Sequence, residues 1–254
     1  MPSARITVLA ALAAFGLSCR SGPPPAIDPA LAACVPAAAT ILAGANLDRL
    51  RTSPLHRQLP TAALAFLESL GGAGSVLVAS DGGNYLVLTR GDFRQAPSGA
   101  TLLGQGLAAV GSPDWLRAAA SRHGRPAAAT NGLLARAEPL AAAAEIWIAA
   151  AGNASLPLSG NSENLNRLLH ATQYATLTVR LTDQVSLDVV GMCSGPEPAR
   201  HLEETVRAFV TLGAAGTARQ PAVSGLLRRI RVTRDGRVVY VTLVAQAAEL
   251  KPFF

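Results

Sequence analysis

The chain has 254 residues, of which 50% are hydrophobic and 15% are charged. A chain so rich in apolar residues and so poor in charge is not intrinsically disordered over most of its length. Its formal net charge of +6 falls short of the concentrated basic face that nucleic-acid binding requires, so we exclude that class of protein.

The first 18 residues have the pattern of a secretory signal. One arginine and no acid occur in residues 1–5, and residues 6–17 form a run rich in Ala and Leu. This run is shorter than the roughly 20 apolar residues of a membrane-spanning helix, but it fits the apolar region of a signal peptide. We therefore predict that residues 1–18 are a signal peptide and that the protein is exported.

The sequence "GLSC", which ends at Cys19, resembles the lipobox of bacterial lipoproteins. In that family the cysteine thiol is acylated and the cysteine becomes the new N-terminus. The resemblance implies that Cys19 is the lipidation site. The aliphatic residue expected three positions before the cysteine is replaced by Gly16, so ordinary secretory cleavage is the alternative.

Residues 20–29, "RSGPPPAIDP", contain four prolines, which favour an extended chain over a packed element. We predict a Pro-rich tether over residues 19–33. In lipoproteins an aspartate after the acylated cysteine is associated with retention in the inner membrane, and Arg20 stands there instead. The resemblance thus implies an outer-membrane lipoprotein, with a secreted periplasmic protein as the alternative.

The segment 34–124 is predicted to be an N-terminal α+β half. A buried strand over 40–45 is followed by helical turns from Leu47 and by a helix over 62–70. Two strands, "SVLVAS" and "NYLVLTR", flank Asp81, Gly82 and Gly83, which is the pattern of a tight hairpin. A short strand within "LAAVG" and a helix over 113–123 complete this half.

The segment 125–254 repeats this order as a C-terminal α+β half. Its predicted elements are a strand over 145–150, a helix over 164–172, a hairpin over 174–193, a helix over 198–212 and a hairpin over 228–245 that turns at Asp235 and Gly236. In the helix 198–212 an apolar stripe combines Ala199, Leu202, Val206, Phe209 and Val210.

Helices that fall between hairpins favour an α+β fold with a mixed, largely antiparallel sheet, helices packed on one face, and two similar halves. In the stretch "AATILAGANLDRLRTSPL" and in the order of elements the chain resembles uncharacterised predicted lipoproteins of bacteria. That resemblance brings no known activity.

Two cysteines remain in the predicted mature chain. In an oxidising compartment an even number of cysteines favours a disulfide, so we predict a bridge between Cys34 and Cys193. The alternative is two separate buried thiols.

Five arginines crowd the last hairpin, and Arg229 and Arg231 are predicted to share one strand face. Together with Arg237 they are predicted to bind an anionic lipid or glycan. The alternative is a solvated sheet face whose charges protect an edge strand from aggregation.

His201 lies between Glu197 and Glu204 at helical spacing, which suggests a metal-binding face or a small periplasmic hydrolase. The alternative is a solvated helix face, on which Glu203 and Arg207 form an ordinary pair.

The glycines of "GQGLAA", Gly104 to Ala109, lack the strand and helix of a dinucleotide site. We assign no catalytic residue, no metal ligand and no cofactor.

These observations predict an exported, lipid-anchored envelope protein that acts by binding or structural association and is not an enzyme. Its expected partners are a membrane, through the lipid anchor, and an anionic lipid or glycan. The alternatives are the small hydrolase and a subunit of an envelope assembly, which would expose an apolar patch too large for a monomer.

Overall fold

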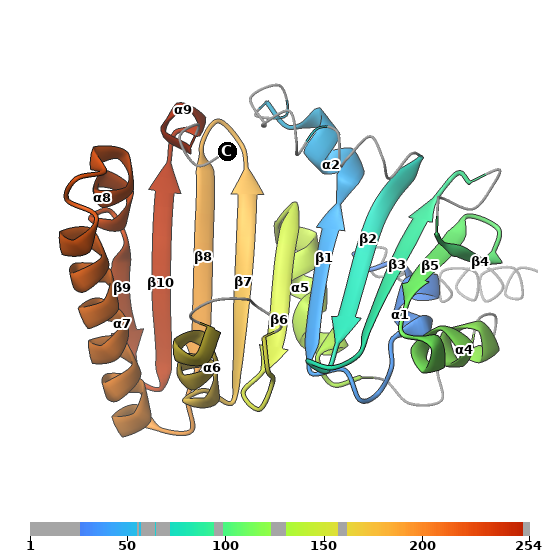
Figure 1. Cartoon of the computed structure of the whole chain (residues 1–254), viewed down its shortest axis with the longest axis horizontal. Coiled ribbons are helices and arrows are strands. Elements are labelled where there is room, and N and C mark those ends of the chain that lie inside the picture. The colour runs from blue at the N-terminus through green and yellow to red at the C-terminus, as the bar shows by residue number, and fades with distance from the viewer. Residues whose placement is uncertain are drawn as a thin grey trace, which may run out of the picture.

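The computed structural model describes residues 26–54, 56, 64, 72–93, 99–122, 131–156 and 162–250. Ten strands in these ranges form one sheet in the order β4-β5-β3-β2-β1-β6-β7-β8-β10-β9 (Figure 1). Every pairing between neighbouring strands is antiparallel. The predicted α+β class is therefore confirmed.

The strands of the first half are β1 (Ile41–Asn46), β2 (Ala73–Ser80), β3 (Tyr85–Gly91), β4 (Thr101–Gly104) and β5 (Leu107–Gly111).

The predicted hairpin joins β2 to β3. In its turn the Asp81 carboxylate accepts hydrogen bonds from the backbone N–H groups of Gly83 and Asn84 at 2.9 and 2.6 Å, which lowers the pKa of Asp81. Gly82 has a φ of 96°, a conformation that favours glycine.

The strands of the second half are β6 (Ile146–Ala151), β7 (Tyr174–Leu181), β8 (Val185–Met192), β9 (Arg231–Asp235) and β10 (Val238–Ala245). The two predicted hairpins are the pairs β7–β8 and β9–β10. The halves meet where β1 pairs with β6. They therefore belong to one continuous sheet.

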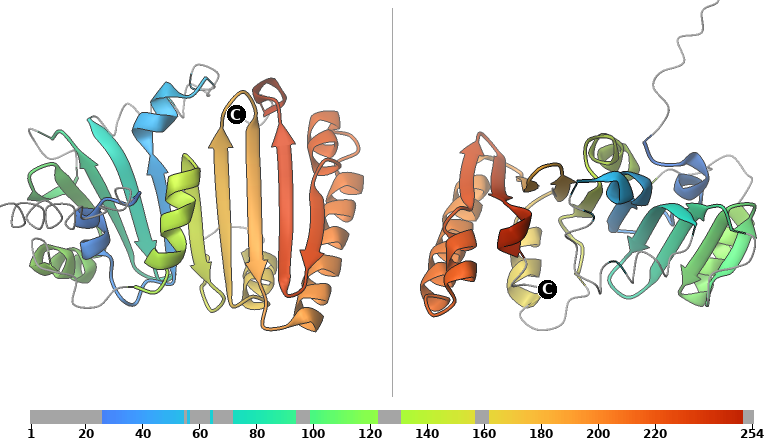
Figure 2. Two further views of the ribbon diagram at one scale, coloured as in Figure 1. Left: turned by 180° about the vertical axis from the view of Figure 1, so that it is seen from behind. Right: turned by 90° about the horizontal axis from the view of Figure 1, so that it is seen from above.

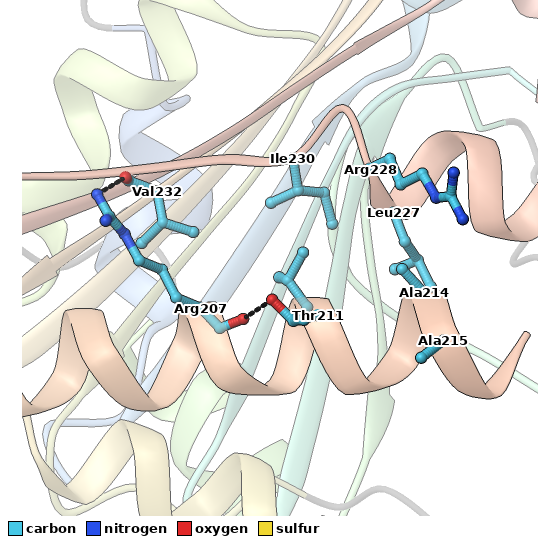
Figure 3. A pocket seen from close by; sticks show the side chains of 9 residues that line it. Arg207, Thr211, Ala214, Ala215, Leu227, Arg228, Ile230 and Val232 are labelled. Atoms are coloured by element: carbon cyan, nitrogen blue, oxygen red, sulfur yellow. Dashed lines mark hydrogen bonds between the residues drawn. The ribbon is translucent and has the colours of Figure 1, made fainter.

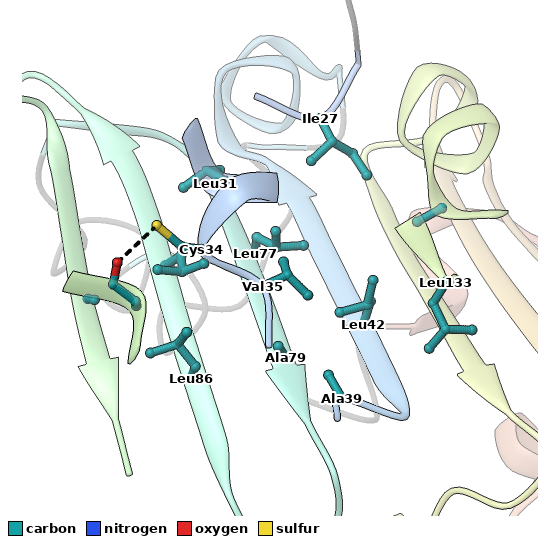
Figure 4. Packing of buried hydrophobic residues seen from close by; sticks show 14 of the residues in the cluster. Ile27, Leu31, Cys34, Val35, Ala39, Leu42, Leu77, Ala79, Leu86 and Leu133 are labelled. Carbon is teal, nitrogen blue, oxygen red and sulfur yellow. Dashed lines mark hydrogen bonds between the residues drawn. The ribbon is translucent and has the colours of Figure 1, made fainter. Parts of the chain in front are cut away.

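One face of the sheet, here called the α5 side, is covered by α1 (Pro29–Cys34), α4 (Pro113–Arg122) and α5 (Leu134–Ala143). The main core lies between these helices and the first half of the sheet (Figure 4). Its largest fully buried members are leucines: Leu31, Leu42, Leu77, Leu86, Leu88 and Leu107. Aliphatic side chains thus dominate the core, in agreement with a sequence in which only 4% of the residues are aromatic.

The opposite face, here called the α7 side, carries α2 (Leu47–Thr52), α6 (Ser162–His170), α7 (Pro196–Gly216) and α8 (Pro221–Leu227). A last short helix, α9 (Ala247–Leu250), follows β10. In β1 the side chain of Leu42 packs on the α5 side, whereas that of Ile41 packs toward Leu169 of α6. The prediction that helices cover one face only is wrong, because alternate residues of the central strands are apolar on both faces.

The predicted tether over 19–33 is too long. Asp28 caps α1 by accepting a hydrogen bond from the Ala30 N–H at 2.7 Å, and Ile27 is only 6% exposed. Residues 26–34 therefore belong to the folded body. The predicted signal peptide, Cys19 and most of the predicted helix 62–70 lie outside the described residues.

Gly44 is a position where the sheet requires glycine. It lies directly opposite Trp147 in the β1–β6 pair, and a Cβ atom on Gly44 would overlap the indole ring. We expect Gly44→Ala to destabilise the protein by about 1–3 kcal/mol, because a buried backbone and a large ring must both move. Chemical denaturation measures this free energy. The control is Gly83→Ala, whose Cβ would meet only Asp81 Oδ1 at 3.7 Å; equal stability of the two variants would contradict the prediction.

Candidate functional site

A groove of about 610 Å³ lies between α7, α8 and the chain that leads into β9 (Figure 3). Its floor and walls are mainly apolar, and an arginine stands at each end. It is lined by Arg207, Val210, Thr211, Ala214, Ala215, Leu227, Arg228, Ile230 and Val232. It lies on the α7 side, at the end of the sheet that carries the last hairpin (Figure 1).

Small residues on α7 allow α8 to approach at one end of the groove. The Ser224 hydroxyl of α8 donates a hydrogen bond to the Ala214 carbonyl at 3.1 Å. A Cβ atom on Gly213 would lie 3.4 Å from the side chain of Leu227, so the helices are close there. Farther along α7, Thr211 and Ile230 face each other across the groove (Figure 3). The groove thus lies along the part of α7 that the side chains of α8 do not cover.

Glu203 connects α7 to β9. Its carboxylate is 2.8 Å from an Arg207 nitrogen and 3.1 Å from Arg234 Nε, and its side chain is only 15% exposed. Arg207 also donates a hydrogen bond to the carbonyl of Val232 at 2.9 Å. The predicted pair of Glu203 and Arg207 is therefore present and Arg207 is 59% exposed, but Glu203 is mostly enclosed rather than solvated. Arg207 is thus held in place by Glu203, which it shares with Arg234.

Arg228 lies at the other end of the groove, and unlike Arg207 it has no carboxylate partner among the described residues. It follows the last residue of α8 and is exposed. None of the side chains that the structure describes forms an ion pair or a hydrogen bond with its guanidinium group. A positive charge at a helix C-terminus is favourable, since the last carbonyl groups carry partial negative charge. Arg228 therefore offers the groove an uncompensated positive charge.

The three predicted anion-binding arginines do not line the groove. Arg229 precedes β9 rather than lying in it, so it shares no strand face with Arg231; this part of the prediction is wrong. Arg229 forms an ion pair with Glu249, and this pairing lowers the pKa of the Glu249 carboxyl to about 2. Because that pKa is depressed, the pair stabilises the fold at neutral pH and is lost as the pH falls toward 2.

Arg231 and Arg237 are exposed on other surfaces. Arg231 begins β9 and, by strand alternation, points to the face opposite Val232 and the groove. Arg237 lies in the β9–β10 turn. Of the groove arginines, Arg228 belongs to the predicted cluster of arginines, whereas Arg207 is placed there by the packing of α7 on β9. The sequence around Arg207 indicated only a surface ion pair with Glu203.

The predicted hydrolase residues lie on the outer surface of α7. His201 is exposed and its Nδ1 is 3.9 Å from a Glu204 oxygen. Arg200 instead pairs with both Glu197 and Glu204 at 3.0 Å, so the carboxylates face a guanidinium group rather than a cleft. Across the described ranges there is no group of three or more acidic, His or Cys side chains that could hold a metal ion.

The two cysteines lie on opposite sides of the sheet. Cys34 packs with the main core on the α5 side, and Cys193 packs with Leu202 on the α7 side. Both are free and fully buried, so the predicted disulfide is wrong. Burial raises the pKa of each thiol, which disfavours the reactive thiolate.

The glycine pattern of "GQGLAA" also has a structural explanation. Gly104 ends β4 and Leu107 begins β5, with Gly106 at a φ of 67° in the turn between them. The spacing is that of a hairpin. Within the part of the chain that the structure describes, no helix is both long and apolar enough to cross a membrane.

Comparison with known proteins identifies similar folds only. No family model matches the chain, and no curated protein matches it. The crystal form III structure of TP0453, a Treponema protein, is 9% identical and has a TM-score of 0.50; the match covers 89% of this chain and 97% of that one. Crystal form I of TP0453 matches with 10% identity, a TM-score of 0.45 and coverage of 89% and 96%. The first of these supports the architecture described above.

Glu203 should control both stability and the shape of the groove. We expect Glu203→Gln to lower the free energy of unfolding by about 1–3 kcal/mol, because two guanidinium groups lose a charged partner that is mostly buried. Urea denaturation of the variant measures the loss. Glu204→Gln is the matched control, since Glu204 is 57% exposed and should change stability by less than about 0.5 kcal/mol. Equal losses in the two variants would show that Glu203 does not connect α7 to β9.

Proposed function

We propose that this protein is an exported, lipid-anchored protein of the bacterial cell envelope that binds an anionic amphiphile in the groove between α7, α8 and β9. The observation that carries the binding proposal is an apolar groove with the exposed, uncompensated Arg228 at one end. An apolar chain would lie along Val210, Leu227 and Ile230, and its anionic head would lie beside Arg228.

The chemistry of the groove favours a lipid over a glycan. Sugars are recognised through many hydrogen bonds, and the polar groups of the groove are already used. Thr211 donates its hydroxyl hydrogen to the carbonyl of Arg207 at 2.9 Å, and Arg207 is held by Glu203 and Val232. What remains is apolar surface and one positive charge, which together suit a phospholipid with an anionic headgroup.

The anchoring proposal is supported by the sequence "GLSC", which ends at Cys19 after an apolar run of the length found in signal peptides. Among the described residues, the first contacts with the folded body are those of Ala26 and Ile27, seven and eight residues after Cys19 in the sequence. An outer-membrane position is favoured by Arg20, as the lipoprotein resemblance implies.

A second candidate function is a subunit of an envelope assembly. Three large apolar side chains are exposed on the α7 side of the first half: Tyr85 at 50%, Leu102 at 42% and Val110 at 36%. Strand pairing places them on the same face of β3, β4 and β5. Light scattering of the purified protein distinguishes a monomer from an assembly.

The test of anchoring is Cys19→Ala in a bacterial host with lipoprotein processing. The unaltered protein is expected to fractionate with membranes and to carry acyl chains on Cys19 by mass spectrometry. The variant is expected in the soluble fraction. Identical fractionation and processing of both proteins would exclude lipidation at Cys19.

The test of the groove compares two charge reversals three residues apart. We expect Arg228→Glu to weaken binding of short-chain phosphatidylglycerol at least tenfold, since a charge-assisted contact contributes roughly 1.5–3 kcal/mol. Arg231→Glu changes the net charge equally but lies outside the groove, so it should bind normally. Thr211→Trp should also prevent binding by filling the groove. Isothermal titration calorimetry measures the affinities, and circular dichroism checks folding.

Three results would contradict the proposal. Equal binding by the two charge variants would show that net charge, not the groove, attracts the lipid. Equal binding of phosphatidylcholine would remove the role of Arg228. Equal binding of lipopolysaccharide and of its acyl-free polysaccharide would favour a glycan ligand. Binding of the anionic lipid should weaken with salt, because the Debye length falls from about 10 Å at 0.1 M to about 3 Å at 1 M.

A further inference from the structure

Arg207 closes one end of the groove. Its side chain reaches from α7 to β9, where the guanidinium group donates a hydrogen bond to the Val232 carbonyl at 2.9 Å (Figure 3). The Glu203 carboxylate lies 2.8 Å from the same guanidinium group. These two contacts, one on each element, hold the Arg207 side chain across this end of the groove. An apolar chain that enters beside Arg228 therefore meets a fixed polar group at the far end.

The apolar part of the groove is short. Along α7 the groove extends from Arg207 to Ala215, which at a rise of about 1.5 Å per residue is about 12 Å. An extended carbon chain advances roughly 1.2 Å per bond, because the three bonds of one extended residue span at most about 3.3–3.6 Å. A straight chain of about ten carbon atoms thus fills this length.

The volume of the groove gives a second limit. A water molecule occupies about 30 Å³ in the liquid, and a methylene group is of similar size. The groove of about 610 Å³ therefore holds roughly twenty such groups, which is enough for one ten-carbon chain with its headgroup. Each chain of a bilayer phospholipid spans half of the roughly 30 Å hydrocarbon core, so its two chains together contain at least about 25 carbons. They exceed the volume of the groove.

The position of Arg207 also explains why a longer chain gains nothing. Figure 2 shows α7 at the end of the sheet farthest from α1 and α4, and the Arg207 side chain on this helix is 59% exposed. Water therefore hydrates its guanidinium group on the open side. Methylene groups laid over this group would remove the water without supplying a hydrogen bond, which is unfavourable for a charged group. The excess of a longer chain therefore turns out of the groove into water.

We infer that the groove selects anionic amphiphiles whose chains have at most about ten carbons, and that Arg207 sets this limit. The inference rests on the binding proposed above and defines its ligand class more narrowly. A lipid of an ordinary bilayer would leave part of each chain outside the groove. The favoured ligand is a medium-chain anionic amphiphile, which is soluble enough to exchange through water.

The limit is tested with monoalkyl phosphates from hexyl to tetradecyl, each below its critical micelle concentration. Isothermal titration calorimetry measures their affinities for the purified protein. We expect the affinity to rise at least about twofold per methylene group up to the decyl chain, because each of these groups is removed from water. Beyond the decyl chain the gain should fall below about 1.2-fold per methylene group, because the added groups stay in water. An unchanged rise up to the tetradecyl chain would overturn the limit.

Two variants test the role of Arg207. In Arg207→Met a flexible apolar side chain replaces the fixed guanidinium group. The break in the series should then move by about two to four carbons, since the chain gains up to one helical turn of α7. Arg207→Lys keeps a hydrated charge and should keep the break at the decyl chain. The readout is the position of the break, so a uniform loss of affinity does not imitate the result. An unchanged break in Arg207→Met would show that Arg207 does not set the limit.

Binding itself is judged by a different residue. If Arg228→Glu leaves the affinity for octyl phosphate unchanged, the proposed binding in the groove fails, and the length limit fails with it. If Arg228→Glu prevents binding but the series of the unaltered protein shows no break, only the length limit fails. Circular dichroism checks that each variant is folded.

Discussion

The pairing of β1 with β6 is the constraint on which the rest of the structure depends. It joins two five-stranded halves into one sheet, and the Trp147 indole covers it by lying over Gly44. Glu145, just before β6, strengthens this junction. Its carboxylate accepts a hydrogen bond from the Leu181 N–H at 2.8 Å and pairs with Arg49 of α2 at 2.8 Å. Both halves are thereby fixed to the same central pair of strands.

From this centre the strand order is the same in both directions: β1-β2-β3-β5-β4 on one side and β6-β7-β8-β10-β9 on the other. The halves differ in the connection between their third strand and the hairpin that follows. Residues 92–100 make this connection in the first half, whereas residues 193–230 make it in the second and contain α7 and α8. The candidate groove is formed by this longer connection. The described residues of the first half therefore contain no counterpart of it, although the strand order is nearly symmetric.

Local signals were sufficient to predict most of the sheet. Alternating apolar residues predicted the strands, and Asp-Gly pairs predicted two of the turns. Both occur at the expected places, because each signal depends on only a few neighbouring residues. Side-chain placement between distant elements could not be predicted in this way. Glu203 was expected to be solvated because its helical neighbours are charged, yet the packing of α7 on β9 encloses it between Arg207 and Arg234. The even number of cysteines suggested a bridge, but only the topology shows that the sheet separates Cys34 from Cys193.

The two faces of the second half of the sheet differ in what covers them. On the α5 side, strand pairing forms a cross-strand row of Thr178, Asp188 and Thr242, with Arg180 paired to Asp188 at 2.8 Å. Val244 on the same face is 48% exposed, so this face is mixed in polarity. On the α7 side, α7 packs over β9 and β10 and forms one wall of the apolar groove. An apolar chain bound there is sheltered between a helix layer and the sheet, which the exposed row on the α5 side does not offer.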